Sequence, residues 1–411
     1  MDIRRRNIVV SLDVGTSAVK AALGEVIYGQ DISVLGIAQV PSIGLRKGNI
    51  IDIENTAKAI DHCLNELERL TGLEISSAVV GFSGTSVQVV NNHAVVAVGN
   101  PNYEITQEDK DRVLKSSQNI VLPPDKTIVQ TIARQYIVDG YDGVKDPIGM
   151  VGSRLEVEVA VIIAAAAGLQ NLHRSATRIN LQIEQMVYNP LLVAESVLLP
   201  AEKEIGVALV DIGGGTTEIA IFEEGSLVFT SVLPVGGDYI TKDLAIVLRT
   251  SIEEAARVKE NHGFASPGMV SDEMNINVNN IQGGESKIVS QHMVADIINA
   301  RVLEMAEMIN VELEQSGFRE RLPGGVVLTG GGAQLTGIVE TLEEFIHLPV
   351  RLGIAENIKA VATDTIKPQN AVALGGLIHL ARNYRAVESE QNQSLENVFS
   401  RLSFWLKDLF R

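Results

Sequence analysis

Two segments of the chain combine an aspartate with a glycine-containing turn and hydroxyl side chains. The first runs from Ile8 to Ser17 and contains Asp13, and the second runs from Val207 to Thr217 and contains Asp211. The aspartates are 198 residues apart, because 211 − 13 = 198. A motif repeated in this way indicates an internal duplication.

These turns have the composition of a phosphate-binding site. Glycine lets the backbone approach a triphosphate closely, and hydroxyl groups donate hydrogen bonds to its oxygens. Asp13 and Asp211 could hold Mg²⁺ through water molecules, because magnesium prefers oxygen ligands and gives up its own waters reluctantly. The chain contains no G-x-x-x-x-G-K-[ST] motif, so the positive charge would come from Lys20. The sequence therefore predicts a clamp made by Gly15, Thr16, Ser17 and Lys20 on one side and Gly213, Gly214, Gly215, Thr216 and Thr217 on the other.

A third glycine cluster, Gly330, Gly331 and Gly332, follows the apolar run from Val326 to Thr329. Read alone, each of the three clusters predicts no more than a tight turn. Taken together, two matched aspartate turns and a third cluster that could lie against an adenine or ribose predict a cleft for ATP and Mg²⁺.

The elements around these turns predict two related α/β lobes. Each aspartate run and the apolar run after its turn form an expected β-hairpin, with second strands from Val19 to Val26 and from Glu218 to Phe222. Helical patterns follow at Ile53 to Leu70 and at Ile252 to His262. Strands followed by helices, twice over, are typical of a duplicated α/β fold.

Two regions differ from the lobes in composition and in the periodicity of their apolar residues. Short strands and loops rich in Pro, Asp and Gly predict an inserted α+β subdomain over 85–162, and helical periodicity predicts a helix-rich subdomain over 238–321, interrupted by the polar stretch from Asn275 to Ser286. The first lobe would then comprise 1–84 and 163–200, the second lobe 201–237 and 322–385, and a polar linker 386–394.

Composition excludes some classes of protein. There are 34 Lys and Arg against 51 Asp and Glu, a net charge of −17, which disfavours binding to nucleic acid. The single cysteine, Cys63, cannot form an internal disulfide, as expected of a reducing compartment. No apolar run reaches the length of about 18 residues that a membrane-spanning helix needs.

The C-terminal segment, 395–411, predicts an amphipathic helix. On a helical wheel its large apolar residues fall within an arc of about 140°. A helix docked on the protein core is one interpretation; the preceding polar linker and the aromatic residues favour an anchor at a membrane surface. The membrane-facing residues would be Leu395, Val398, Phe399, Leu402, Trp405, Leu406, Leu409 and Phe410.

The three glycine segments, in this order, resemble the phosphate and adenosine motifs of the superfamily that contains actin, sugar kinases and DnaK. Within it, the chain is similar over nearly its whole length to the FtsA family of bacterial cell-division proteins. Telling stretches are Pro41 to Gly48, Gln135 to Gly140, Asp146 to Leu155, Asp211 to Thr217 and Leu322 to Gly325.

The resemblance implies a two-lobed actin and DnaK type of ATPase fold with an inserted subdomain of the FtsA type, called 1C. It also implies ATP binding with at most weak ATPase activity. Gly236, Gly237 and Lys259 would join Gly330 to Gly332 on the adenosine side. The family usually has a carboxylate three residues before this lysine, where the chain has Ala256, and Glu253 or Glu254 could replace it. Glu195 would position the attacking water.

The resemblance further implies self-association into actin-like filaments on the cytoplasmic side of the cell membrane at the division site. Partners would be the C-terminal peptide of FtsZ, bound by Lys287, Arg301 and Glu304, and other division proteins on subdomain 1C. Two alternatives of the same superfamily are a pilus-assembly ATPase and a kinase for a sugar or acetate. Neither would need the terminal amphipathic helix.

Overall fold

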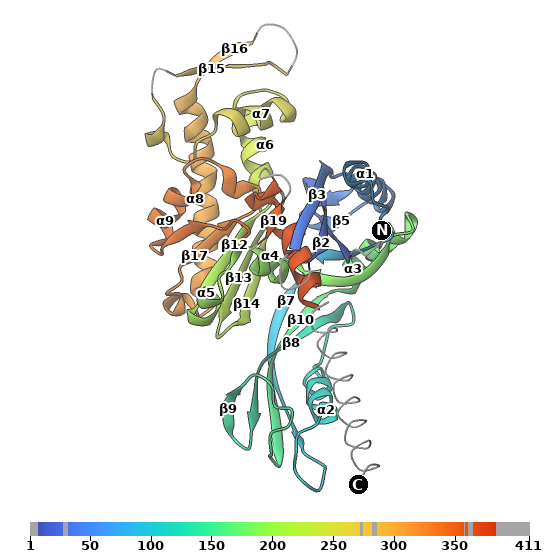
Figure 1. Cartoon of the computed structure of the whole chain (residues 1–411). Coiled ribbons are helices and arrows are strands. Elements are labelled where there is room, and N and C mark those ends of the chain that lie inside the picture. The colour runs from blue at the N-terminus through green and yellow to red at the C-terminus, as the bar shows by residue number, and fades with distance from the viewer. Residues whose placement is uncertain are drawn as a thin grey trace.

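The computed structural model describes residues 7–27, 32–271, 274–281, 286–356, 358–360 and 365–383. They form two α/β lobes with a cleft between them, a helix-rich subdomain on the second lobe, and a subdomain that projects from the first lobe (Figure 1). The predicted linker 386–394 and amphipathic helix 395–411 lie outside the described residues. Within the described ranges, every helix is too short or too polar to cross a membrane.

The described part of the first lobe is built on a six-stranded sheet with the order β11-β6-β1-β2-β3-β19. β1 pairs with β2 in antiparallel and with β6 in parallel fashion. The strands are β1 (Ile8–Val14), β2 (Ala18–Val26), β3 (Ile32–Pro41), β6 (Ser77–Phe82), β11 (Gln182–Tyr188) and β19 (Lys359–Ala360). The helices are α1 (Ile53–Thr71), α3 (Ala166–Arg178), α4 (Asn189–Val197) and one over 371–383; the two-residue strands β4 (Leu45–Arg46) and β5 (Asn49–Ile50) form a small hairpin before α1.

The second lobe repeats this topology. Its five-stranded sheet has the order β14-β13-β12-β17-β18, and β12 pairs with β13 and β17 as β1 pairs with β2 and β6. The strands are β12 (Val207–Ile212), β13 (Thr217–Glu223), β14 (Ser226–Leu233), β17 (Val326–Thr329) and β18 (Val350–Leu352), with α5 (Pro200–Ile205) and α9 (Ile338–Ile346). The expected duplication and both expected hairpins are thus present.

The helix-rich subdomain contains α6 (Gly237–Val247), α7 (Ile252–His262) and α8 (Gln291–Gln315). The Ser251 side chain caps α7 by accepting a hydrogen bond from the Glu254 N–H at 3.2 Å. The polar stretch that begins at Asn275 starts with a strand, β15 (Asn275–Val278), which pairs with β16 (Lys287–Ser290). The strand forms because Ile276 and Val278 alternate with polar residues and are buried.

The inserted subdomain is a four-stranded sheet with one helix. Its strands, β7 (Gln88–Ala97), β10 (Arg154–Ala165), β8 (Lys126–Val138) and β9 (Tyr141–Val144), lie in that order. α2 (Gln107–Ser117) begins at a capping box between Thr106 and Asp109. Alternate apolar residues of β10, from Leu155 to Ile163, pack with Val113 of α2 in a separate core.

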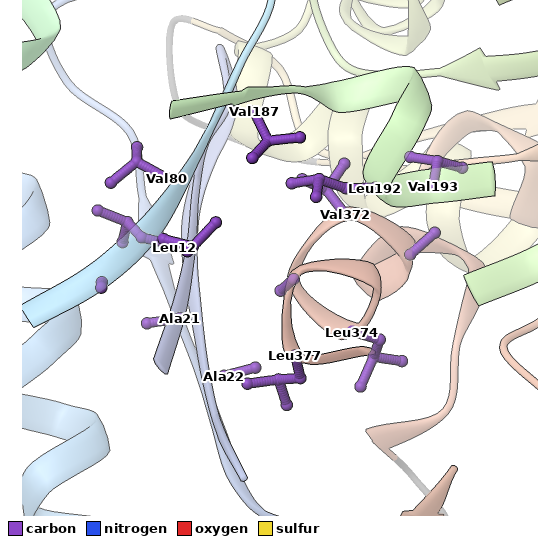
Figure 2. Close-up of a cluster of buried hydrophobic side chains, with 14 of the residues drawn as sticks. Leu12, Ala21, Ala22, Val80, Val187, Leu192, Val193, Val372, Leu374 and Leu377 are labelled. Atoms are coloured by element: carbon purple, nitrogen blue, oxygen red, sulfur yellow. The ribbon is translucent and has the colours of Figure 1, made fainter. Parts of the chain in front are cut away.

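The core of the first lobe fixes the elements that reach the cleft. Figure 2 shows Leu12, Ala22 and Val80 of the sheet on one side, with Leu192 of α4 and Leu377 of the 371–383 helix on the other. These leucines are fully buried. Burying each such side chain stabilises the fold by roughly 1.5–3 kcal/mol, so the start of α4 is held firmly beside the ends of the strands.

Candidate functional site

The two aspartate turns face each other across a cavity of about 610 Å³ between the lobes. A Cβ atom added to Gly214 would lie 1.7 Å from Ser17 Oγ, and one added to Gly215 would lie 2.6 Å from Thr16 Cγ2. Only residues without side chains allow the turns to approach so closely. The predicted residues that line the cavity are Asp13, Gly15, Thr16, Ser17, Lys20, Asp211, Gly213, Gly214, Gly215, Thr216, Gly237, Lys259, Gly330, Gly331 and Gly332.

Three predicted site residues are outside the described cavity lining. Thr217 is buried in β13, where its hydroxyl donates to the Val235 carbonyl at 2.8 Å. Gly236 caps α6 and lies against the second turn, since its added Cβ would be 2.5 Å from the Gly213 oxygen. Glu195 pairs with Arg382 instead of facing the cavity. The expectation that Glu195 positions a water molecule is not supported by this placement.

The paired strands give each aspartate a partner at the same place in its hairpin. Asp13 is opposite Lys20, and Asp211 is opposite Glu218. The Lys20 ammonium lies 3.6 Å from Asp13 Oδ2 and donates to the Gln369 carbonyl at 2.5 Å. The duplication therefore places a cation in one half of the cleft floor and a carboxylate in the other.

Burial of these carboxyl groups changes their acidity. Burial, together with the negative charge of Asp13 and against the opposing effect of Lys20, raises the pKa of Asp211 to about 6. The pKa of Asp13 is also raised by burial, although Lys20 lowers it. Burial and the charge of Asp211 raise the pKa of Glu218 well above its usual range. A cation in the cleft would remove this electrostatic cost.

The charged groups that line the cleft are mostly negative, so a bound cation would be stabilised there. Among the described lining residues there are five carboxylates, Asp13, Asp211, Glu218, Asp238 and Glu260, and two ammonium groups, Lys20 and Lys259. A triphosphate would meet an excess of negative charge here. The described residues hold no cluster of three or more His, Cys, Asp or Glu arranged as metal ligands. The carboxylate oxygens of Asp13 and Asp211 are ligands of the kind that Mg²⁺ prefers, and a Mg²⁺ ion bound by them would keep phosphate oxygens and waters as its other ligands.

The other end of the cleft is formed by α6, α7 and the third glycine cluster. Lys259 donates to Thr241 Oγ1 at 2.8 Å and to the Gly237 carbonyl at 3.2 Å. Gly330 has φ of +90°, and an added Cβ there would lie 2.1 Å from Asp211 Oδ1, so glycine is required on both counts. These residues leave bare backbone along one wall of the cavity.

A carboxylate lies one helical turn after Ala256. Glu260, on the same face of α7, lines the cavity. Glu254 is engaged elsewhere, because its carboxylate accepts hydrogen bonds from Arg257 at 2.8 and 2.7 Å and from the Asn279 N–H at 3.0 Å. The i, i+4 spacing from Ala256 was a signal that could have identified Glu260.

Two further lining residues carry buried atoms that are unpaired. Asn189 Oδ1 and Glu218 Oε2 are buried and have no hydrogen-bond partner among the described residues. Asp238 also lines the cleft and accepts a hydrogen bond from Ser17 Oγ at 2.7 Å. No sequence motif singled out Asn189 or Asp238, because each stands in an ordinary helix-start pattern.

The predicted partner-binding residues lie on the helix-rich subdomain. Arg301 of α8 donates to both oxygens of Asp243 on α6, at 2.6 and 3.1 Å, and also pairs with Glu304. Lys287 of β16 donates to the carbonyl of Leu248 at the end of α6. Lys287 and Arg301 thus both contact α6 or its C-terminal end, Glu304 pairs with Arg301, and Arg301 is already engaged by carboxylates.

Comparison with solved structures identifies the class of protein. The fold matches the PilM-PilN type IV pilus biogenesis complex with a TM-score of 0.64 at 17% identity, over 90% of this chain and 98% of that one. It matches MreB5 of Spiroplasma citri, bound to ADP, with a TM-score of 0.52 at 16% identity, over 92% of this chain and 98% of that one. The two lobes and their cleft are those of an actin-like ATPase fold.

Sequence relatives identify the family. Family models match for cell division protein FtsA over residues 208–375 and for the SHS2 domain inserted in FtsA over residues 84–163. The chain is 39% identical over 350 residues to cell division protein FtsA of Bacillus subtilis, covering 85% of this chain and 79% of that protein. It is 36% identical over 377 residues to FtsA of Pseudomonas aeruginosa, covering 92% and 90%. The chain belongs to the FtsA family of actin-like cell division proteins, which decides against the kinase and pilus-assembly alternatives.

Proposed function

We propose that this chain binds ATP with Mg²⁺ in the interlobe cleft and uses the bound state to assemble into actin-like filaments. The observation that carries the proposal is the pair of duplicated turns that meet with backbone and hydroxyl donors around buried carboxylates. The solved MreB5 structure with ADP, which shares the fold, supports a nucleotide as the ligand.

Within this site, Asp13 and Asp211 would hold the metal, and the two turns would hold the phosphates. Lys259, Glu260 and the Gly330 to Gly332 backbone would face the nucleoside. Asn189 and Glu218 would hold a water molecule near the terminal phosphate, in place of Glu195. The Asn189 amide can orient a water molecule but cannot accept its proton, so proton transfer would fall to Glu218.

We further propose that the filaments lie on the cytoplasmic face of the cell membrane at the division site and tether FtsZ filaments there. The apolar face of residues 395–411 would enter the membrane interface, and Lys287, Arg301 and Glu304 would bind the FtsZ peptide. The inserted subdomain would contact other division proteins. Membership of the FtsA family and the amphipathic pattern of the terminal segment support this role.

Electron microscopy on lipid monolayers tests the proposal. The full chain with ATP and Mg²⁺ should form filaments on the lipid, and Asp211→Ala should form none, because it loses a metal-holding carboxylate without disturbing a packed core. Calorimetry on the same variant should show at least about a tenfold loss of affinity for ATP in the presence of Mg²⁺. Filaments and ATP affinity unchanged by Asp211→Ala would contradict the assigned site.

A further inference from the structure

The first residues of α6 contact both the two glycine turns of the cleft and Arg301 of α8. Asp238, at the first turn of α6, accepts the Ser17 hydroxyl hydrogen at 2.7 Å across the cleft. The hydroxyl has only one hydrogen to donate. A phosphate that recruits Ser17 as a donor must therefore take that hydrogen away from Asp238, which removes one of the contacts between the first lobe and the start of α6.

The small hairpin of β4 and β5 makes a second connection between the turns and α6. The Gly48 N–H donates to Thr16 Oγ1 at 2.9 Å, so the Thr16 hydroxyl keeps its own hydrogen available for a phosphate oxygen. In the same hairpin, Lys47 Nζ lies 5.9 Å from the centre of the Tyr239 ring. The first lobe thus reaches Tyr239, the residue that follows Asp238.

Tyr239 in turn contacts the predicted partner-binding residue. The Arg301 guanidinium lies 5.7 Å from the centre of the Tyr239 ring, and Lys242 of α6 lies 5.0 Å from it. The electrons of an aromatic face attract a cation that lies over it, and the attraction is stronger where water is excluded. Arg301 is held between this ring and Asp243, so a displacement of the start of α6 changes how firmly Arg301 is held.

We propose that the start of α6 couples the nucleotide cleft to the Arg301 surface, so that a bound triphosphate raises the affinity of that surface for an acidic peptide. The coupling rests on the proposed function, since it needs a nucleotide in the cleft and a peptide at Arg301. Phosphate draws Ser17 and Thr16 toward the ligand, Tyr239 loses its contacts with the first lobe, and Arg301 becomes available to carboxylates other than Asp243. By linkage, the peptide strengthens triphosphate binding by the same factor.

Fluorescence anisotropy on the full chain tests the coupling, with a labelled FtsZ C-terminal peptide as the probe. Its affinity is measured without nucleotide, with ADP and with ATP, always with Mg²⁺. We expect at least about fivefold tighter peptide binding with ATP than without nucleotide, the lower end of typical allosteric coupling. A calorimetric titration of ATP with and without saturating peptide should give the same factor.

Matched variants identify the route. Lys47→Ala and Lys242→Ala each remove one cation from the Tyr239 ring, but only Lys47 belongs to the first lobe. Lys47→Ala should therefore bring the ratio of peptide affinities with and without ATP close to one. Lys242→Ala should leave this ratio unchanged. Tyr239→Leu should abolish the ratio, while Tyr239→Phe keeps the ring face and should retain it.

The possible outcomes distinguish a failure of the coupling from a failure of the proposed nucleotide and peptide binding. Equal peptide affinity in all nucleotide states, with both ligands binding, overturns the coupling and leaves the two sites standing. A ratio that survives in both Lys47→Ala and Tyr239→Leu overturns this route. Failure of the peptide to bind in any state overturns the partner site together with the coupling.

Discussion

Three carboxyl groups, those of Asp13, Asp211 and Glu218, meet in the floor of the cleft. Burial raises the pKa of each, and the mutual repulsion of their charges adds to the rise for Asp211 and Glu218. Perturbed carboxyl groups in a cleft are typical of functional sites, because a structure without function would avoid their cost. Without a bound cation, ionisation of these three buried carboxyl groups is therefore unfavourable.

The acidity of Asp211 predicts opposite pH dependences for stability and for binding. Its folded-state pKa of about 6 exceeds the unfolded value of 3.8, so folding favours the protonated form. That contribution to stability is fully present below about pH 3.8 and is lost as the pH rises through about 6. Binding of Mg²⁺ with nucleotide needs the ionised form, so its affinity should fall by up to about tenfold per pH unit below about pH 6.

Asp211→Asn is the variant that tests both effects. Thermal melts of the nucleotide-free variant should show a higher Tm than the parent chain at pH 7.5 and a smaller difference at pH 4.5, because the amide carries no charge at either pH. Calorimetry should show weak binding of ATP with Mg²⁺ at both. A variant less stable than the parent at pH 7.5 would show that Asp211 makes stabilising contacts.

At the scale of elements, the contact between the two turns depends on glycine. Gly214→Ala would place a methyl group 1.7 Å from Ser17 Oγ and 2.7 Å from Ser17 Cβ, so rotation of the serine alone cannot relieve the clash. The lobes must separate at this point, and we expect nucleotide affinity to fall by about tenfold or more, a loss of about 1.4 kcal/mol. The free energy of unfolding should change much less, since each lobe keeps its own core.

Gly168→Ala is the matched control for Gly214→Ala. Gly168 lies in the first turn of α3, is exposed, and has no atom within 4 Å of an added Cβ. Alanine should stabilise the helix by up to about 1 kcal/mol and leave nucleotide binding unchanged. Urea unfolding and calorimetry on both variants provide the comparison; equal nucleotide affinity in the two would show that the turns do not meet in the bound state.

At the scale of the whole molecule, the protein body and the terminal segment are expected to act separately. The chain carries a net charge of −17, and the segment 395–411 carries three cations against two anions, so its apolar face would supply most of the proposed membrane affinity. One such helix gives reversible binding, whereas a filament that presents many gives firm attachment through effective concentration.

Trp405→Glu should therefore release the protein from liposomes in a sedimentation assay, because it places a charge in the middle of the apolar face. Lys407→Gln should weaken binding by no more than a fewfold, and mainly at low salt. Deletion of residues 395–411 should leave a soluble chain that binds ATP with unchanged affinity. Aggregation or loss of nucleotide binding in the truncated chain would instead identify the segment as part of the core.

Local sequence patterns were sufficient to predict the two hairpins and the capped helix α7. The hairpins after Asp13 and Asp211, the capped helix α7 and the repeated topology follow from apolar alternation, turn residues and a Ser N-cap, all of which act between neighbours in the chain. The strand β15 was missed because its apolar residues are few, and only packing against the subdomain core makes that strand favourable.

Tertiary structure alone decided which side chains enter the cleft. Asn189 begins α4 and lines the cavity, whereas Glu195 is six residues further on, roughly 240° around the helix, and faces Arg382. The sequence gives the spacing of these residues but not the rotation of the helix about its axis. That rotation is fixed by Leu192 and Val193, which are buried in the same core as Leu374 and Leu377 of the 371–383 helix. The contact of Ser17 with Asp238, 221 residues apart, likewise arises only when the two lobes pack together.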